Sequence, residues 1–164
     1  KKKAEVLASI PAIQPISNKQ LSHIASGFGM RIDPIYKIPK MHEGLDFTAP
    51  TGTPIHATGN GTISVVEYGD RGYGNHVIIN HMVGYQTHYA HMSRIIVREG
   101  QVVKRGDVIG HVGSTGKSTA PHCHYEVIRN GVKLDPVNFF FNDLTPAEYE
   151  EMLKQAALSN QSFD

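Results

Sequence analysis

Short β-rich runs separated by turn-forming residues fill the middle of the chain and constrain its fold most strongly. Between Gly27 and Val137 the segments "GTISVVEY", "NHVIINH", "YQTHYAHM" and "DVIGHVG" alternate with turns rich in Gly, Asn, Pro and Asp. Strands spaced about ten residues apart are typical of antiparallel sheets in a sandwich or a flattened barrel. We therefore predict a mostly β fold built from antiparallel sheet.

A short helix is expected on each side of this β-rich region. The stretch "SNKQLSHIASGFG" predicts a helix that is capped by Ser17 and stopped by Gly27. Near the other end, "LTPAEYEEMLKQAAL" places Thr145 as N-cap, Pro146 at the first helical position and Glu148 three residues after the cap. The chain is accordingly divided into an N-terminal extension (1–26), a β domain (27–140) and a helical tail (141–164).

Size and charge limit the classes of function. With 164 residues, 40% of them hydrophobic, the chain is long enough for one domain with a substantial core. A formal net charge of +1 without a concentrated basic face argues against nucleic-acid binding. No apolar run approaches the ~20 residues that span a bilayer. The opening Lys1–Lys3 run is interpreted as a solvated end, and a membrane tether outside this sequence stays open as an alternative. The oligomeric state is not readable.

Two histidines one residue apart interrupt the strand-like run "PHCHYEV". Side chains alternate along a strand, so His122 and His124 share one face and Cys123 points to the other, as a buried small hydrophobe. Two adjacent imidazoles are costly to protonate together, which favours neutral ligands or bases. The alternative is a pair of partly exposed histidines on an edge strand. Because Cys123 is the one cysteine of the chain, an internal disulfide is excluded.

A second cluster lies upstream in "MHEGLDF", where His42 and Asp46 are four residues apart. On a strand these positions share a face, and an imidazole nitrogen with a carboxylate oxygen is a donor pair that zinc accepts. A third ligand from the His-x-His pair would give a catalytic zinc site with one open position. A structural site, which needs four protein ligands and usually thiolates, fits less well. Taken alone, His42 and Asp46 are a weak signal, because a hydrogen-bonded surface couple would give the same pattern.

Four segments follow one another along the chain: "HEGLDFTAPTGTPIHA", "GYGNHVIINH", "THYAHMS" and "GSTGKSTAPHCHYEV". In this order they resemble the motifs of the LytM/lysostaphin-type zinc metallopeptidases, which cut peptide bonds in bacterial peptidoglycan, and the match runs from Phe28 to Pro136. The resemblance implies a mostly antiparallel β fold whose sheet floors a narrow groove walled by loops. We interpret the "GSTGKSTAP" loop as one wall, which delivers His122, and the "RGYGN" segment as the other.

The resemblance also implies roles for individual residues. His42, Asp46 and His124 would bind Zn²⁺, while His91 and His122 would lie outside the metal shell. These two histidines are the candidates for proton transfer and for stabilising the tetrahedral oxyanion, and the choice of base between them stays open.

The remaining site residues are expected from the loops and from strand parity. Tyr73 and Asn75 in "RGYGN" are predicted to bind substrate, with loop packing as the alternative for Tyr73. His88 has the opposite strand parity to His91 and is expected to face away from the site. The other histidines are expected at the surface or in turns: His23, His56, His76, His81 and His111.

The resulting hypothesis is a zinc-dependent endopeptidase acting on peptidoglycan stem peptides, in the bacterial cell envelope (periplasmic or extracellular), exported or membrane-anchored. The alternative from another class is a non-catalytic murein-binding or amidase-activating module. A small cupin-like metal-binding domain is a second rival, disfavoured by its motif order. As the bond that is cleaved, a stem-peptide cross-link is favoured over a glycine bridge, so the expected activity is that of a D,D-endopeptidase. Residues 1–26 folding over the groove as an inhibitor is an open alternative.

Overall fold

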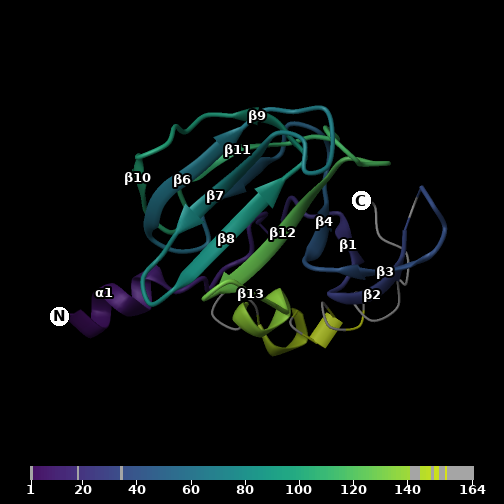
Figure 1. Ribbon diagram of the computed structural model, residues 1–164. Coiled ribbons are helices and arrows are strands. Elements are labelled where there is room, and N and C mark those ends of the chain that lie inside the picture. The colour runs from purple at the N-terminus through teal and green to yellow at the C-terminus, as the bar shows by residue number, and fades with distance from the viewer. Residues whose placement is uncertain are drawn as a thin grey trace.

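The protein is built around one large antiparallel sheet, described by a computed structural model for residues 2–17, 19–33, 35–140, 145–148, 150–151 and 154 (Figure 1). Its strands are, in spatial order, β1 (His23–Ser26), β4 (Leu45–Thr48), β12 (His122–Arg129), β8 (Tyr85–Ala90), β7 (His76–Asn80), β6 (Gly61–Glu67) and β10 (Val102–Val103), with β13 (Val132–Leu134) beside β12. The β-rich pattern predicted from the sequence is therefore confirmed.

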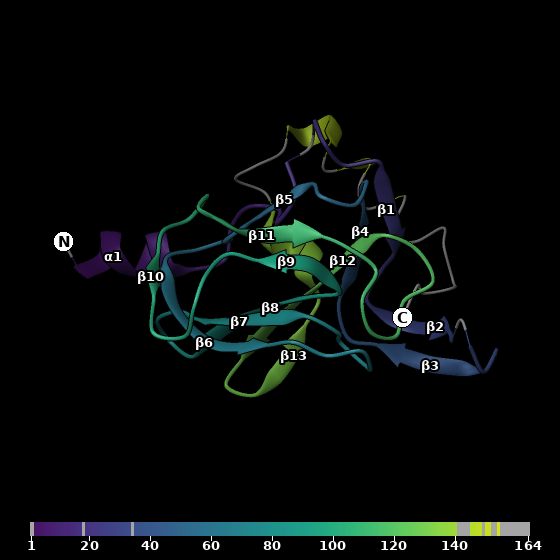
Figure 2. The ribbon, with the colours of Figure 1, turned by 90° about the horizontal axis from the view of Figure 1, so that it is seen from above.

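Two smaller sheets complete the fold. One contains β5 (Pro54–His56), β11 (Val108–Val112) and β9 (Met92–Ile95), and it packs over the large sheet as the second layer of a flattened sandwich (Figure 2). The other is a hairpin of β2 (Gly29–Ile32) and β3 (Pro39–His42), at one end of the molecule. A short 3-10 helix, η1 (Pro136–Phe139), follows β13 and is capped by the Asp135 side chain, which accepts from the backbone N–H of Val137.

The core lies between the two layers and includes a hydrogen-bonded polar centre. Phe47, Tyr89 and Tyr125 are fully buried there. The hydroxyl groups of Tyr89 and Tyr125 lie 3.0 and 2.7 Å from Thr58 Oγ1, so their polar ends are satisfied within the apolar interior. Burial raises the pKa of Tyr89 to about 12, which keeps this phenol neutral at physiological pH. Cys123 is buried in the same core, as predicted.

The helix expected after Ser17 is a wrong prediction. The backbone makes a turn, in which the N–H groups of Gln20 and Leu21 donate to Ser17 O, and then continues as β1. β1 pairs with the edge of β4 in the large sheet. These sheet hydrogen bonds outweigh the local preference of the segment for a helix. The N-terminal helix is instead α1 (Lys2–Ser9).

The first helix of the N-terminal extension lies away from the predicted groove (Figures 1 and 2), whereas β1 pairs with β4 and has Ser26 as the register partner of Asp46. α1 is at the end of the molecule opposite the β2–β3 hairpin (Figures 1 and 2). The last turn of α1 and the residue that follows the helix are held by the Arg105 guanidinium, which donates to Leu7 O and Ile10 O at 2.7 Å. No helix among the described residues is long and apolar enough to cross a membrane.

At the other end of the chain, residues 146–148, 150–151 and 154 are helical. The predicted capping box is present: Glu148 N–H donates to Thr145 Oγ1 at 3.1 Å, and Thr145 N–H donates to Glu148 Oε1 at 2.9 Å. The rest of the predicted tail lies outside the described residues.

Candidate metal centre

The site begins with two side chains that the sheet places directly opposite each other. In the antiparallel pair β4–β12, His124 is the register partner of Asp46. Their chain neighbours Phe47 and Tyr125 point into the core, so Asp46 and His124 project from the other face. Because directly opposed side chains start only about 5 Å apart, the register alone brings the two groups into contact.

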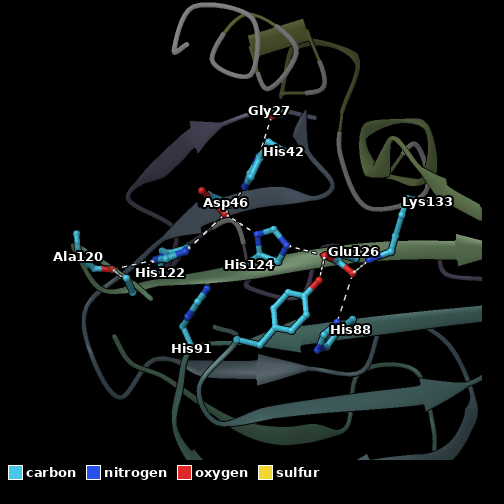
Figure 3. Close-up of polar contacts among 12 residues, drawn as sticks. Gly27, His42, Asp46, His88, His91, Ala120, His122, His124, Glu126 and Lys133 are labelled. Carbon is cyan, nitrogen blue, oxygen red and sulfur yellow. Dashed lines mark hydrogen bonds and ion pairs between the residues drawn. The ribbon is translucent and has the colours of Figure 1, made fainter. Parts of the chain in front are cut away.

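His42 at the end of β3 completes a set of three. Asp46 Oδ1 lies 3.2 Å from His42 Nε2 and 3.1 Å from His124 Nδ1 (Figure 3). The candidate ligand atoms of the three residues lie within 4.8 Å of one another, and all three side chains are at most 5% exposed. The structure therefore brings together the predicted metal ligands.

In His42 and His124, the hydrogen bond made by the ring nitrogen that points away from Asp46 (the outer nitrogen) decides whether the nitrogen that faces Asp46 carries a proton. His42 Nδ1 donates to Gly27 O at 2.9 Å, and His124 Nε2 donates to a Glu126 carboxylate oxygen at 2.9 Å. In the neutral rings, the nitrogens that face Asp46 are then lone pairs. Two lone pairs and a carboxylate that converge in a buried space need a cation between them, so these residues fit a metal ion.

Glu126 is a residue of the candidate site that the sequence reasoning missed. This buried carboxylate accepts hydrogen bonds from His124, from Tyr73 Oη (2.8 Å) and from Lys133 Nζ (2.6 Å), and His88 Nδ1 lies 3.3 Å away. Burial alone would raise its pKa, but the hydrogen bonds from His124 and His88 outweigh burial and hold the Glu126 pKa well below its usual range. The signal was present, because Glu126 is the third same-face residue of "HCHYE".

The two predicted non-ligand histidines, His91 and His122, lie side by side against the three candidate ligands. Their ring centroids are 4.8 Å apart, and both side chains are buried. His91 Nδ1 donates to Thr115 O at 2.7 Å and His122 Nδ1 to Ala120 O at 2.8 Å. The Nε2 atom of the neutral ring is therefore the proton acceptor in both, and that of His122 lies 3.5 Å from Asp46 Oδ1.

The acceptor carbonyls of His91 and His122 come from one loop, residues 113–121, which is packed against the 72–75 loop. Gly116 lies so close to the neighbouring loop that a Cβ atom would meet Gly74 N at 2.3 Å and Gly72 O at 2.5 Å. The N–H of Lys117 donates to Gly72 O at 2.8 Å. These contacts fix the loop that orients both histidines.

A cavity of about 180 Å³ opens over this arrangement, lined by His42, His91, His124 and Glu126 together with Tyr73 and Lys117 from the two loops. Burial, and then the nearby Glu126 carboxylate, raise the pKa of Tyr73, so its hydroxyl stays protonated.

Asn75, the other predicted substrate-binding residue, is not among the lining residues. Its amide donates to Met92 O and accepts from the N–H of Gly69, which pins the loop. Substrate binding by Asn75 therefore stays a prediction from the sequence.

The expectation that His88 faces away from the site is wrong. His91 follows β8 in a left-handed conformation (φ 60°), so parity counted along the strand does not extend to it. His88 is the register partner of Glu126 and lies on the site face, 4.2 Å from the Tyr73 ring between centroids. Burial lowers the pKa of His88 to about 4, so this imidazole is neutral at physiological pH.

His81, expected at the surface or in a turn, is partly buried where β7 leads into the next turn. Both ring nitrogens have partners, Asn60 O at 2.8 Å and Thr87 Oγ1 at 2.7 Å. Its role is therefore to join neighbouring segments.

This fold and this donor set define a class, a small β-sheet metallopeptidase domain. The family model described as Peptidase family M23 matches residues 40–136. The chain is 46% identical over 117 residues to the DD-carboxypeptidase/endopeptidase Mpg of Neisseria meningitidis, covering 71% of this chain and 27% of that protein. It is 41% identical over 114 residues to the peptidoglycan DD-endopeptidase ShyC of Vibrio cholerae, covering 69% and 26%.

A solved structure gives the same result. The catalytic domain of the antimicrobial peptidase lysostaphin from Staphylococcus simulans superimposes with a TM-score of 0.65 at 35% identity, over 71% of this chain and 90% of that domain. The chain belongs to peptidase family M23. It spans about a quarter of the length of the curated relatives it matches.

Proposed function

We propose that this chain is the catalytic part of a zinc-dependent endopeptidase that hydrolyses stem-peptide cross-links in bacterial peptidoglycan. The observation that carries the proposal is the convergence of His42, Asp46 and His124 beside two further histidines whose outer nitrogens are held by backbone carbonyls. Membership of peptidase family M23 and similarity to peptidoglycan DD-endopeptidases support the substrate class.

Zinc is the metal that the donor set favours. Two imidazole nitrogens and one carboxylate oxygen are a ligand combination found in catalytic zinc sites, which keep one further position open. When bound, the ion supplies a Lewis acid and lowers the pKa of its water to about 7. Gly27 O and Glu126 would hold the His42 and His124 rings in the tautomers that such binding requires.

The chain's own residues would handle the protons and the developing charge. His91 lines the cavity and presents Nε2 as a proton acceptor, because its Nδ1 proton is committed to Thr115 O. The neutral His122 ring has the same tautomer, with its proton on Nδ1, and it contacts both His91, at 4.8 Å between ring centroids, and Asp46, whose Oδ1 lies 3.5 Å from its Nε2. A proton accepted by either ring turns Nε2 into a donor, which can protonate the leaving amine or stabilise an oxyanion.

The cell envelope, on its periplasmic or extracellular side, is the location proposed for this activity, because peptidoglycan is found there. The support is the similarity to relatives whose names describe action on peptidoglycan. The second candidate, a non-catalytic murein-binding module, is disfavoured by the presence of all three candidate ligands and of both neighbouring histidines.

The test is digestion of purified murein sacculi and of defined cross-linked muropeptides, with products identified by mass spectrometry. Zinc-loaded protein should cleave, and chelated protein should not. His91→Ala and His122→Ala should each lower the rate by about 100-fold or more while zinc content stays near one ion per chain, since neither residue is a proposed ligand. Equal cleavage by chelated and zinc-loaded protein, or full activity of both variants, would contradict the proposal.

A further inference from the structure

Lys40 is a cation at the rim of the cavity that opens over the candidate metal centre. It lies two residues before His42 on β3, so the two side chains share one face of that strand. Positions i and i+2 of a strand are about 7 Å apart, which an extended lysine side chain spans. Lys40 lines the same cavity as His42, His91 and His124, and its side chain is 60% exposed.

The other charges around this cavity are paired within the protein. Lys117 Nζ lies 2.5 Å from Asp33 Oδ2, and Lys133 Nζ lies 2.6 Å from a Glu126 oxygen. Asp33 is buried and also accepts backbone N–H groups from residues 35 and 36. These pairs leave no strong unbalanced charge at their positions.

Lys40 lacks a comparable partner. Among the described residues its one ion pair is a 3.9 Å contact to Asp33 Oδ2, the oxygen that Lys117 already holds at 2.5 Å. The Glu43 carboxylate also lines the cavity, but its Oε1 atom lies 3.9 Å from Lys133 Nζ. The hairpin side of the cavity thus carries an uncompensated ammonium group that an anion on the substrate would complement.

We infer that Lys40 is a specificity-determining residue that binds a free carboxylate on the substrate residue carrying the leaving amine. The inference rests on the proposed function and narrows its substrate class. In a cross-link to the D-centre of a diamino acid, the carbon that bears the leaving nitrogen also bears a carboxylate. A glycine bridge has no carboxylate at that position, so Lys40 favours the acidic cross-link.

The experiment compares two cross-linked peptides that differ only in this carboxylate, present as the free acid or as the primary amide. Zinc-loaded protein should show a kcat/KM about 2- to 5-fold higher for the acid, as expected for an ion pair made by a mostly exposed lysine. Lys40→Met should bring the acid-to-amide ratio close to one, and Lys40→Arg should retain most of it. Lys104→Met is the control, because Lys104 is exposed beside β10 at the opposite edge of the large sheet, and it should keep the wild-type ratio.

A wild-type ratio near one, or an unchanged ratio in Lys40→Met, would overturn the inference. If neither peptide is cleaved, the proposed function fails, and binding decides the role of Lys40 separately. Acid and amide forms of the peptide would be titrated into zinc-loaded wild type and Lys40→Met by calorimetry. Tighter binding of the acid that is lost in Lys40→Met supports the inference, and equal binding of the two forms refutes it.

Discussion

At the scale of single residues, the candidate site depends on groups that do not themselves face the metal position. Gly27 O and Glu126 hold the outer nitrogens of His42 and His124, while Thr115 O and Ala120 O do the same for the two other histidines. Each acceptor selects one tautomer, and the tautomer decides whether the inward nitrogen is a lone pair or a proton. The tautomers of the four imidazoles are therefore set by groups that lie one contact away from the metal position.

Glu126→Gln should weaken zinc binding by about 10- to 100-fold, because an uncharged amide orients His124 less strongly and removes the carboxylate charge that Lys133 contacts at 2.6 Å. Competition with a fluorescent chelator measures the dissociation constant. Glu43→Gln, which removes the more exposed carboxylate at the rim, should change the constant by less than about threefold. Equal affinity in Glu126→Gln and wild type would show that Glu126 does not support the ligand.

At the scale of elements, the close approach of two loops orients His91 and His122. Gly116 has a φ of +74° and contacts the 72–74 backbone, so the 113–121 loop lies against the other loop with no room for a side chain. The loop supplies both acceptor carbonyls. A displacement there should therefore alter proton transfer before it alters metal binding.

Gly116→Ala should lower kcat by at least about tenfold, since small misplacements of catalytic groups cost up to 100-fold, and should keep zinc bound. It should also destabilise the fold by about 2–3 kcal/mol, from left-handed strain plus overlap with Gly74. Gly100→Ala is the matched control, because its φ is +87° with nothing within 4 Å of a Cβ. Urea unfolding and turnover assays distinguish them, and equal losses in both variants would exclude a role for the loop contact.

At the scale of the whole molecule, the β2–β3 hairpin forms a separate two-stranded sheet, and an isolated hairpin is only marginally stable. The pair of Asp33 and Lys117 joins it to the 113–121 loop across 84 residues of sequence. Burial alone would raise the pKa of Asp33, but the Lys117 ammonium and two backbone N–H groups outweigh it and lower this pKa to about 2.

Asp33→Asn should therefore reduce the free energy of unfolding at pH 7 by about 1–3 kcal/mol. A lowered carboxyl pKa contributes stability above the ordinary value near 3.8, and the contribution disappears as the pH falls through about 2. The difference between variant and wild type should shrink over that interval. Urea denaturation at pH 7, 4 and 2.5 tests this, with Asp70→Asn at an exposed position as control. A difference independent of pH would assign the effect to packing alone.

The division into residues 1–26, 27–140 and 141–164 stays a prediction. The family match covers residues 40–136, and β1, which lies before residue 27, pairs with β4 in the large sheet. The described residues before 27 thus contribute a strand to the same sheet as the candidate ligands.

By itself, the sequence determined the features that depend on local periodicity and spacing. Alternation along "PHCHYEV" placed His122 and His124 on one face and Cys123 in the core, and the turn-separated β runs predicted an antiparallel β fold. The Thr145–Glu148 capping box also followed from neighbouring residues. In each case the decisive interactions act within a few residues, where strand or helix geometry is fixed.

Only the tertiary structure decided the features that depend on contacts distant in sequence. Residues 23–26 form a strand because β4 offers an edge, although the local pattern favoured a helix. His88 joins the site because the register of β8 and β12 places it opposite Glu126, and His91 joins it because a left-handed turn after β8 breaks the strand parity. Glu126 is contacted by four side chains, which come from β8, β12, β13 and the 72–75 loop. Backbone carbonyls also select the imidazole tautomers. Such choices depend on which segments the folded sheet brings together, and local residue patterns do not encode that.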